Sequence, residues 1–232
     1  YSNNEYGEVA PFREKGDGLQ DELSEATIKN REQFLTDNHL TREKIVELKQ
    51  FHTDKVIFVS KKDFGAGYID EADGMITNEK GVALSVFTSD CLPVFFYDPA
   101  HKIIAIAHAG WRGVYSNIIP KTVQQISLRF QSDPQNILVW IGPHVSGDSY
   151  CFENNHYNDS PANEYFDSMG GIKQGQDTFC VDLGLIAHKQ LTDSGIAPDH
   201  IETSKLDTKT DNRLFSYQAG DRTNNMGVIM MK

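Results

Sequence analysis

Three residues in the middle of the chain, His52, Cys91 and His108, have the chemistry of an open zinc site. Zinc favours a thiolate with two imidazoles, and a catalytic zinc site keeps three protein ligands and one position for water or substrate. The long spacings make these residues a constellation and not a local motif. Taken alone, Cys91 and His108 are also consistent with buried core residues, since free cysteine behaves as a small hydrophobic residue. Spacing by itself leaves both interpretations open.

The positions of these residues favour the metal interpretation. Cys91 and His108 stand where predicted strands end, and functional residues gather where strands meet loops. Asp90, beside Cys91, can orient a ligand imidazole through a hydrogen bond. His144 follows Gly142-Pro143 at the end of another predicted strand, and it either joins the pocket or lies in a loop.

The turn Gly110-Trp111-Arg112-Gly113 predicts an anion site. It joins a buried strand to a helix N-terminus, where free N–H groups and the helix dipole favour negative charge. Arg112 supplies a guanidinium fork suited to phosphate. The alternative is a tight turn in which Trp111 fills the core and Arg112 is solvated. No Gly-Lys-Ser/Thr follows, so the turn is not a P-loop.

Hydrophobic periodicity and capping residues predict the elements that carry these side chains. Helices are expected over 24–39, 41–48 with Thr41 as N-cap, 117–130, and from the N-cap Asp182 to about Gly195. Strands are expected over 56–60, 82–88, 94–97, 102–108, 136–141 and 226–231. Strands mixed with helices, without steady alternation, indicate an α+β or mixed α/β fold of layered sheets and helices.

Composition limits the classes of partner and compartment. The 232 residues carry a net charge of −11, which argues against nucleic acid or an anionic membrane as partner. The three cysteines are odd in number and include no C-x-x-C pair; this pattern does not suggest a disulfide framework and favours a reducing cytoplasm, with Cys151 and Cys180 as structural residues. No signal peptide or membrane-spanning stretch is evident; the chain begins at Tyr1 and not at Met, so we expect that its natural start is missing. No linker or repeat divides the chain, so one domain over 1–232 is expected.

Seven short motifs then give a specific resemblance, which covers the chain from about Asn30 to the C-terminus. They resemble, in the same order, the motifs of the laccase-domain family, whose members have been called multicopper polyphenol oxidases, purine nucleoside phosphorylases and peptidoglycan editing factors. The motifs are Gln50-Phe51-His52, Glu71-Ala72-Asp73-Gly74, Thr88-Ser89-Asp90-Cys91-Leu92-Pro93, Ala107-His108-Ala109-Gly110-Trp111-Arg112-Gly113, Ile141-Gly142-Pro143, Val181-Asp182-Leu183 and Phe215-Ser216-Tyr217.

The resemblance implies a fold, a ligand set and a reaction. The fold is a layered α/β domain similar to the catalytic domain of the cytotoxic necrotizing factor toxins, and the metal ligands are His52, Cys91 and His108. The implied reactions are phosphorolysis of adenosine, inosine, guanosine and methylthioadenosine, together with adenosine deamination. Deamination needs a hydroxide, which zinc-bound water supplies through its lowered pKa.

Other residues fit this chemistry as hypotheses. Arg112 would hold phosphate against the sugar, and Trp111 would stack on the base. The leaving purine needs a proton or hydrogen bond, for which Asp90, Asp73 and His144 are candidates. The partners are then a purine nucleoside and phosphate, and the oligomeric state stays open.

The chain departs from the family pattern in ways that bear on substrate and rate. Thr53 replaces a glycine, and Glu202 stands where a Cys-Thr pair is common. Gln218, Ala219 and Asn225 stand in segments that tend to carry arginines, so positive charge that would help hold phosphate is missing. Three alternatives therefore accompany the nucleoside enzyme: a copper-dependent phenol oxidase, an amidase of a cell-wall precursor, and a metal-binding module without catalysis. Blue-copper sites favour an additional axial methionine, and no methionine lies close to the three ligands in sequence.

Overall fold

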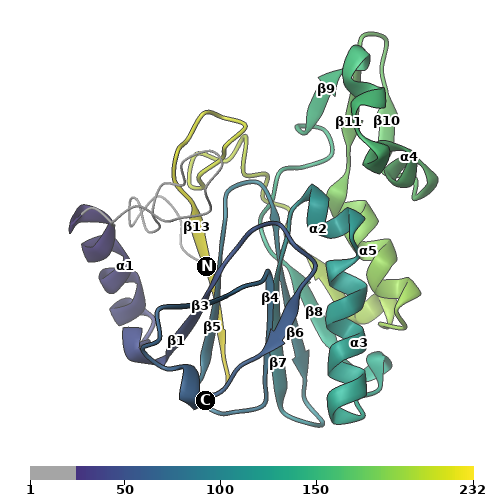
Figure 1. Ribbon diagram of the computed structural model, residues 1–232. Coiled ribbons are helices and arrows are strands. Elements are labelled where there is room, and N and C mark those ends of the chain that lie inside the picture. The colour runs from purple at the N-terminus through teal and green to yellow at the C-terminus, as the bar shows by residue number, and fades with distance from the viewer. Residues whose placement is uncertain (1–24) are drawn as a thin grey trace.

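The computed structural model describes residues 25–232, including all side chains except those of residues 25–28 and 158–159. Figure 1 shows four layers, in which α1 covers one face of a smaller sheet and a group of helices covers the outer face of a larger one. The described helices are α1 (Glu25–Asp37), α2 (Trp111–Tyr115), α3 (Ile118–Phe130), α4 (Pro161–Ser168) and α5 (Leu183–Asp193). This architecture confirms the predicted mixed α/β class of layered sheets and helices.

The larger sheet has six strands in the order β12-β8-β6-β7-β4-β2. Its central strands are antiparallel, and the edge pairs β12–β8 and β2–β4 are parallel. The strands are β2 (Val56–Phe58), β4 (Gly74–Thr77), β6 (Leu92–Asp98), β7 (Ile103–Ala109), β8 (Leu138–Ile141) and β12 (Ile201–Thr203).

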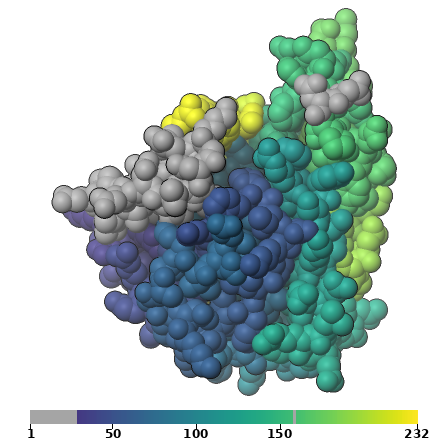
Figure 2. All heavy atoms as spheres, viewed as in Figure 1, coloured from purple at the N-terminus to yellow at the C-terminus, as the bar shows by residue number. Residues whose placement is uncertain are grey.

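The smaller sheet has four strands in the order β13-β5-β1-β3. They are β1 (Ile45–Lys49), β3 (Tyr68–Glu71), β5 (Ala83–Thr88) and β13 (Asn225–Met230). A third sheet, β10-β11-β9, lies in a lobe with α4 that projects from the rest of the molecule (Figures 1 and 2). Its strands are β9 (Cys151–Glu153), β10 (Ile172–Gln174) and β11 (Thr178–Val181).

Strand β7 is buried on both faces, which explains its continuous run of apolar residues. Ile103, Ala105 and Ala107 pack in the core beneath the outer helices, whereas Ile104 and Ile106 pack in the core between the two large sheets. Successive side chains of a strand point to opposite faces. Because of this alternation, His108 follows Ile104 and Ile106 on the face of β7 that lies between the two large sheets, at the end of the strand.

Several predicted elements are confirmed and one is wrong. Asn117 precedes α3, and Asp182 caps α5 by accepting a hydrogen bond from the Leu185 N–H at 2.8 Å. The predicted first helix is present from Glu25, and its expected first residue Ser24 lies outside the described residues. The helix expected over 41–48 is instead a short 3₁₀ turn followed by β1. Burial between two core layers selects a strand there, because Val46 and Leu48 contact one layer while Ile45 contacts the other.

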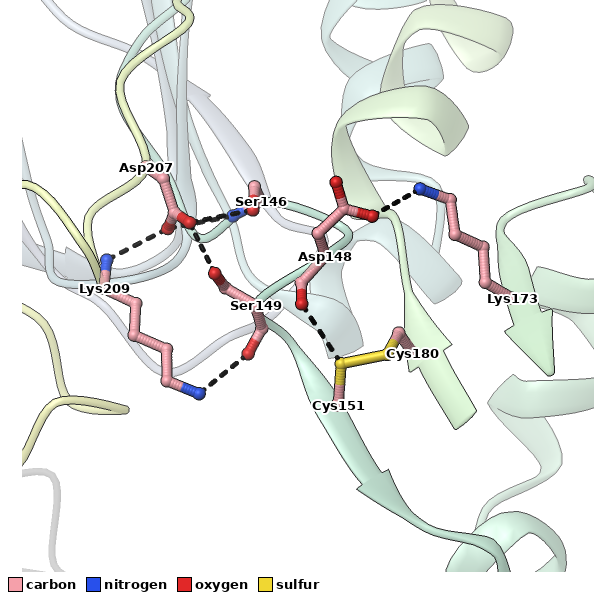
Figure 3. Close-up of a disulfide and its surroundings, with 8 residues drawn as sticks. All are labelled: Ser146, Asp148, Ser149, Cys151, Lys173, Cys180, Asp207 and Lys209. Atoms are coloured by element: carbon pink, nitrogen blue, oxygen red, sulfur yellow. Dashed lines mark hydrogen bonds and ion pairs between the residues drawn. A yellow bond between two sulfur atoms is a disulfide. The ribbon is translucent and has the colours of Figure 1, made fainter. Parts of the chain in front are cut away.

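The expectation that the cysteines form no disulfide is also wrong. Cys151 and Cys180 are bonded across β9 and β11, where they are directly opposed in the strand register (Figure 3). The two residues are 29 positions apart, so only the pairing of these strands brings them together. Cysteine content therefore does not support a reducing compartment. Within residues 25–232, no helix has both the length and the apolar character to cross a bilayer.

Candidate metal centre

The structure brings His52, Cys91 and His108 together. Cys91 directly precedes β6, and the β6–β7 register places Pro93 opposite His108. The candidate ligand atoms of the three residues lie within 4.8 Å of one another, and the Cys91 Sγ is 3.7 Å from the His52 Nε2. The two imidazole rings meet edge to face with centroids 4.7 Å apart.

The donor set and its spacing fit a tetrahedral metal ion. Zinc bonds of about 2.3 Å to sulfur and 2.0–2.1 Å to nitrogen place those two ligand atoms roughly 3.6 Å apart at a tetrahedral angle. The observed Cys91–His52 separation of 3.7 Å matches this value. The group can therefore bind a metal ion, and three ligands leave a fourth position for another molecule.

Gly110 provides the space for this cluster. A Cβ atom at this position would lie 2.7 Å from the His52 Cδ2 and 2.8 Å from the Cys91 Sγ. Its backbone angles, φ −73° and ψ 173°, are open to any residue. The requirement for glycine is therefore steric and not conformational.

Asp73 orients both histidines. Its buried carboxylate accepts a hydrogen bond from the His108 Nδ1 at 2.7 Å, which leaves the His108 Nε2 for the metal position. It also accepts from the backbone N–H groups of Phe51, His52 and Thr53, and from the Thr53 hydroxyl at 2.8 Å. These bonds fix the loop in which His52 adopts a left-handed conformation with φ 58°. Asp73 is thus a positioning residue and is too buried to reach a substrate.

The electrostatics of the cluster favour a thiolate beside a charged imidazole. Burial raises the pKa of Cys91, but the charge and hydrogen bonds of His108 and His52 outweigh it and lower that pKa to about 6. Burial lowers the pKa of His108, but Cys91 and Asp73 raise it to about 9. A thiolate is the form of cysteine that binds metal.

Asp90 has a different role from the one predicted. Its carboxylate accepts hydrogen bonds from the Thr208 hydroxyl, the Ser216 hydroxyl and the Gln218 N–H, at 2.7–2.8 Å. It therefore holds the C-terminal loop against the segment that carries Cys91, and Asp73 is the residue that orients an imidazole. Asp90 is next to Cys91 in the chain, but its carboxylate does not face a histidine ring. The pairing of β4 with β7 brings Asp73 beside the His108 ring instead.

The departures from the family pattern lie in this C-terminal loop. The Ala219 N–H donates to the Ser216 hydroxyl at 3.1 Å. The Asn225 side chain donates to the carbonyls of Thr88 and Phe215. Gln218 and Ala219 thus each donate a hydrogen bond from the backbone N–H, and the Asn225 side chain links Phe215 of the loop to Thr88 of β5.

Arg112 and Trp111 form one unit at the start of α2. The Arg112 guanidinium lies over the Trp111 ring, 4.4 Å from its centroid, and Arg112 is exposed. Trp111 is half-buried and packs against the core beneath the helices. Trp111 therefore supports the guanidinium on one face, and its stacking on a base stays a prediction.

His144 lines a cavity that the three ligands do not line. It is buried, its Nδ1 bonds to the Gly142 carbonyl at 2.8 Å, and its ring packs beside Gly184 of α5. The neighbouring Val145 N–H donates to the Asp90 carbonyl, so the backbone of this loop borders the Cys91 segment.

Two residues near the centre were not predicted as functional. Thr53 donates from its N–H and its hydroxyl to the Asp73 carboxylate, and its position next to His52 is the signal in the sequence that could have identified it. Tyr150 is half-buried; burial and the negative charges of Cys91 and Asp90 raise the pKa of its hydroxyl, while Arg112 opposes the rise. No local pattern marks Tyr150, because the fold alone returns its loop to the site.

The fold and the site together define a mixed α/β protein with a His–Cys–His group that can bind a metal. A family model described as multi-copper polyphenol oxidoreductase laccase matches residues 11–232, and the chain belongs to this family. The purine nucleoside phosphorylase YlmD of Bacillus subtilis is 31% identical over 219 residues, which cover 91% of this chain and 79% of that protein. The purine nucleoside phosphorylase SAR1163 of Staphylococcus aureus is 32% identical over 181 residues, which cover 73% of this chain and 65% of that protein. These relatives support the assignment of the chain as an enzyme.

Solved structures share the fold. The hypothetical protein YfiH of Bacillus licheniformis superimposes with a TM-score of 0.79 at 24% identity, covering 89% of this chain and 81% of that one. The YlmD protein of Geobacillus stearothermophilus gives the same values. The NMB0706 protein of Neisseria meningitidis gives a TM-score of 0.74 at 24% identity, covering 90% of this chain and 83% of that one.

Proposed function

We propose that the protein is a zinc-dependent purine nucleoside phosphorylase that also deaminates adenosine. Its nucleoside substrates would be adenosine, inosine, guanosine and methylthioadenosine. The observation that carries the proposal is the open cluster of His52, Cys91 and His108, in a chain 31% identical to a protein named as such a phosphorylase. When bound by these three residues, zinc would supply Lewis acidity and a lowered pKa for a water in its open position.

Arg112 is the proposed phosphate holder. Its guanidinium is exposed and is kept in place by stacking on Trp111, so it can present a fork to two phosphate oxygens. Phosphate held in this way would attack the anomeric carbon as the bond to the purine nitrogen breaks. The electron pair of that bond leaves with the base, and the proton of the phosphate nucleophile balances the charge on the purine.

Tyr150 is the proposed hydrogen-bond donor to the departing base. Asp73 and Asp90 both accept several internal hydrogen bonds and His144 faces another cavity, which leaves these three predicted candidates poorly placed. A raised pKa keeps the Tyr150 hydroxyl protonated at neutral pH. The phenol can therefore donate to a purine nitrogen in the transition state.

The two reactions give a direct test, because deamination needs no phosphate. Purified protein would be incubated with adenosine, with and without phosphate, and adenine and inosine would be separated by chromatography. We expect inosine in both samples and adenine only with phosphate. Arg112→Ala should raise the KM for phosphate and leave inosine formation nearly unchanged. Arg129→Ala is the matched control, since Arg129 also stacks on an aromatic ring, Phe58, at 4.0 Å.

Metal analysis distinguishes this function from copper-dependent phenol oxidation. Protein purified without added metal should contain about one zinc per chain, and Cys91→Ala should lose both the zinc and the turnover. Stoichiometric copper together with oxygen-dependent oxidation of a catechol would favour the oxidase. Absence of adenine and inosine formation in zinc-loaded protein would refute the nucleoside function.

A further inference from the structure

A second cavity lies along α5 from Asp182 to Thr192, and the ligand cluster is not part of its wall. It has a volume of about 650 Å³, is open to solvent, and is lined by α5, the loop after β8 and the segment that follows β12. His52, Cys91, His108 and Arg112 do not line it. Volumes of about 300–1,000 Å³ are typical of sites for small organic molecules.

His144 is a buried polar group on the wall of this cavity. The side chain is 93% buried, since its residue exposes only 7% of its surface. The Gly142 carbonyl can only accept, so the Nδ1 of His144 carries the ring proton and donates at 2.8 Å. The other nitrogen, Nε2, has no hydrogen-bond partner among the described residues and is directed toward Gly184, a lining residue that has no side chain to cover it. His144 thus offers a free acceptor to a hydroxyl or N–H group.

The cavity wall carries two lysines, Lys189 and Lys205, and two carboxylates, Asp182 and Asp207, and of these four groups the carboxylates are engaged by hydrogen bonds. Lys189 on α5 and Lys205 after β12 line the cavity, and no described carboxylate of residues 29–232 lies within 4.0 Å of either ammonium. Asp207 is already satisfied, because it accepts hydrogen bonds from Ser146, Ser149 and the Lys209 N–H (Figure 3).

The remaining wall residues complete the chemistry. Asp182 is engaged as the N-cap of α5 through the Leu185 N–H. The side chains of Leu185 and Leu206, exposed by 45% and 38%, supply apolar surface beside the lysines. The cavity thus presents two ammonium groups, one buried acceptor and an apolar flank.

We propose that this cavity binds a hydroxylated phosphate monoester, such as a sugar phosphate or a nucleoside monophosphate. Lys189 and Lys205 hold the phosphate from two sides, and a hydroxyl of the ligand donates to the His144 Nε2. A dianionic phosphate suits two separate lysines, and charged hydrogen bonds of this kind are among the stronger polar contacts. The apolar flank accommodates the carbon skeleton. This binding site is additional to the proposed nucleoside reaction and can exist without it.

Isothermal titration with ribose 5-phosphate tests the proposal, with ribose and inorganic phosphate as partial probes. Ribose 5-phosphate should bind more tightly than either partial probe. Lys189→Ala with Lys205→Ala should weaken its binding by about tenfold or more. The matched control is Lys61→Ala with Lys62→Ala, which removes the same charge from an exposed turn remote in sequence. Cys91→Ser should leave the affinity unchanged, because that residue does not line the cavity.

His144→Phe tests the acceptor. It should reduce the affinity for ribose 5-phosphate to near that for inorganic phosphate, and if this variant does not fold, the double lysine variant decides because both side chains are exposed. Four results would overturn the proposal: no saturable binding of ribose 5-phosphate, equal binding of inorganic phosphate by wild type, equal weakening by the two lysine pairs, or loss of binding in Cys91→Ser. The last result would assign the ligand to the metal centre.

Discussion

Asp73→Asn should weaken metal binding without removing any ligand. Asp73 is fully buried, and its two oxygens accept five hydrogen bonds, from three backbone N–H groups, the Thr53 hydroxyl and the His108 Nδ1. Asparagine has the same shape, but one oxygen becomes an NH₂ group that can only donate. The substitution therefore places a donor against donors, whichever way the amide is turned.

The two orientations of the amide have different consequences. With NH₂ toward Thr53, the N–H groups of Phe51 and Thr53 lose their acceptor, and each unsatisfied buried group costs about 1–3 kcal/mol. With NH₂ toward His108, the Nδ1 must become an acceptor, so the ring proton moves to the Nε2 that faces the metal position. The first orientation loosens the loop of His52, and the second gives His108 the wrong tautomer. We expect a loss of about 2–5 kcal/mol in unfolding free energy and of about 10–100-fold in zinc affinity.

Zinc affinity would be measured by competition with a chromophoric chelator, and unfolding free energy by urea titration of metal-free protein. The control is Asp70→Asn, which removes the carboxylate of an exposed pair with Lys55 at 2.9 Å. Such a pair contributes less than about 1 kcal/mol, and the control should keep the zinc affinity. A folded Asp73→Asn protein with wild-type zinc affinity would refute the assigned role of Asp73.

We expect three further measurable effects, at Gly110, at the Cys151–Cys180 bond and at Asp98. Gly110→Ala should lower zinc affinity by about tenfold in dialysis measurements, because the added Cβ would lie 2.7 Å from the His52 Cδ2 while the backbone angles tolerate alanine; equal affinities would contradict the steric role. Reduction of the Cys151–Cys180 bond, which spans 29 positions, should lower the unfolding free energy by about 3–4 kcal/mol in urea titration; identical curves with and without reductant would show that the bond contributes nothing. Burial raises the pKa of Asp98, but hydrogen bonds from Ser132, from the His101 side chain and from the backbone N–H groups of Ala100 and His101 outweigh it and hold that pKa below its usual range. Its carboxylate therefore stabilises the folded state above the unfolded pKa and loses this effect as pH falls, so the stability difference between wild type and Asp98→Asn should shrink below about pH 4; a constant difference down to pH 2 would contradict the assignment.

Local sequence patterns correctly predicted the helices and strands whose apolar residues recur at helical or strand spacing. The helix of residues 118–130 and the strands β5, β6 and β7 agree with their apolar spacing and turn signals. The segment Ile45–Lys49 was mispredicted as a helix because one short run of apolar residues suits both periods, and only the core layers on its two sides select the strand. The projecting lobe was missed because its strands have only three or four residues and little internal periodicity.

The residue types along the chain set the chemistry that this protein can offer. Its motifs identified the family and named His52, Cys91 and His108, because residue types set which ligands and charges exist. The tertiary structure alone decided which groups meet: Asp73 and not Asp90 faces the imidazole, Cys151 bonds to Cys180, and His144 lines a second cavity. Contacts between residues far apart in the chain depend on the register of paired strands and on the path of the loops between them. A local stretch of sequence does not specify that register or that path.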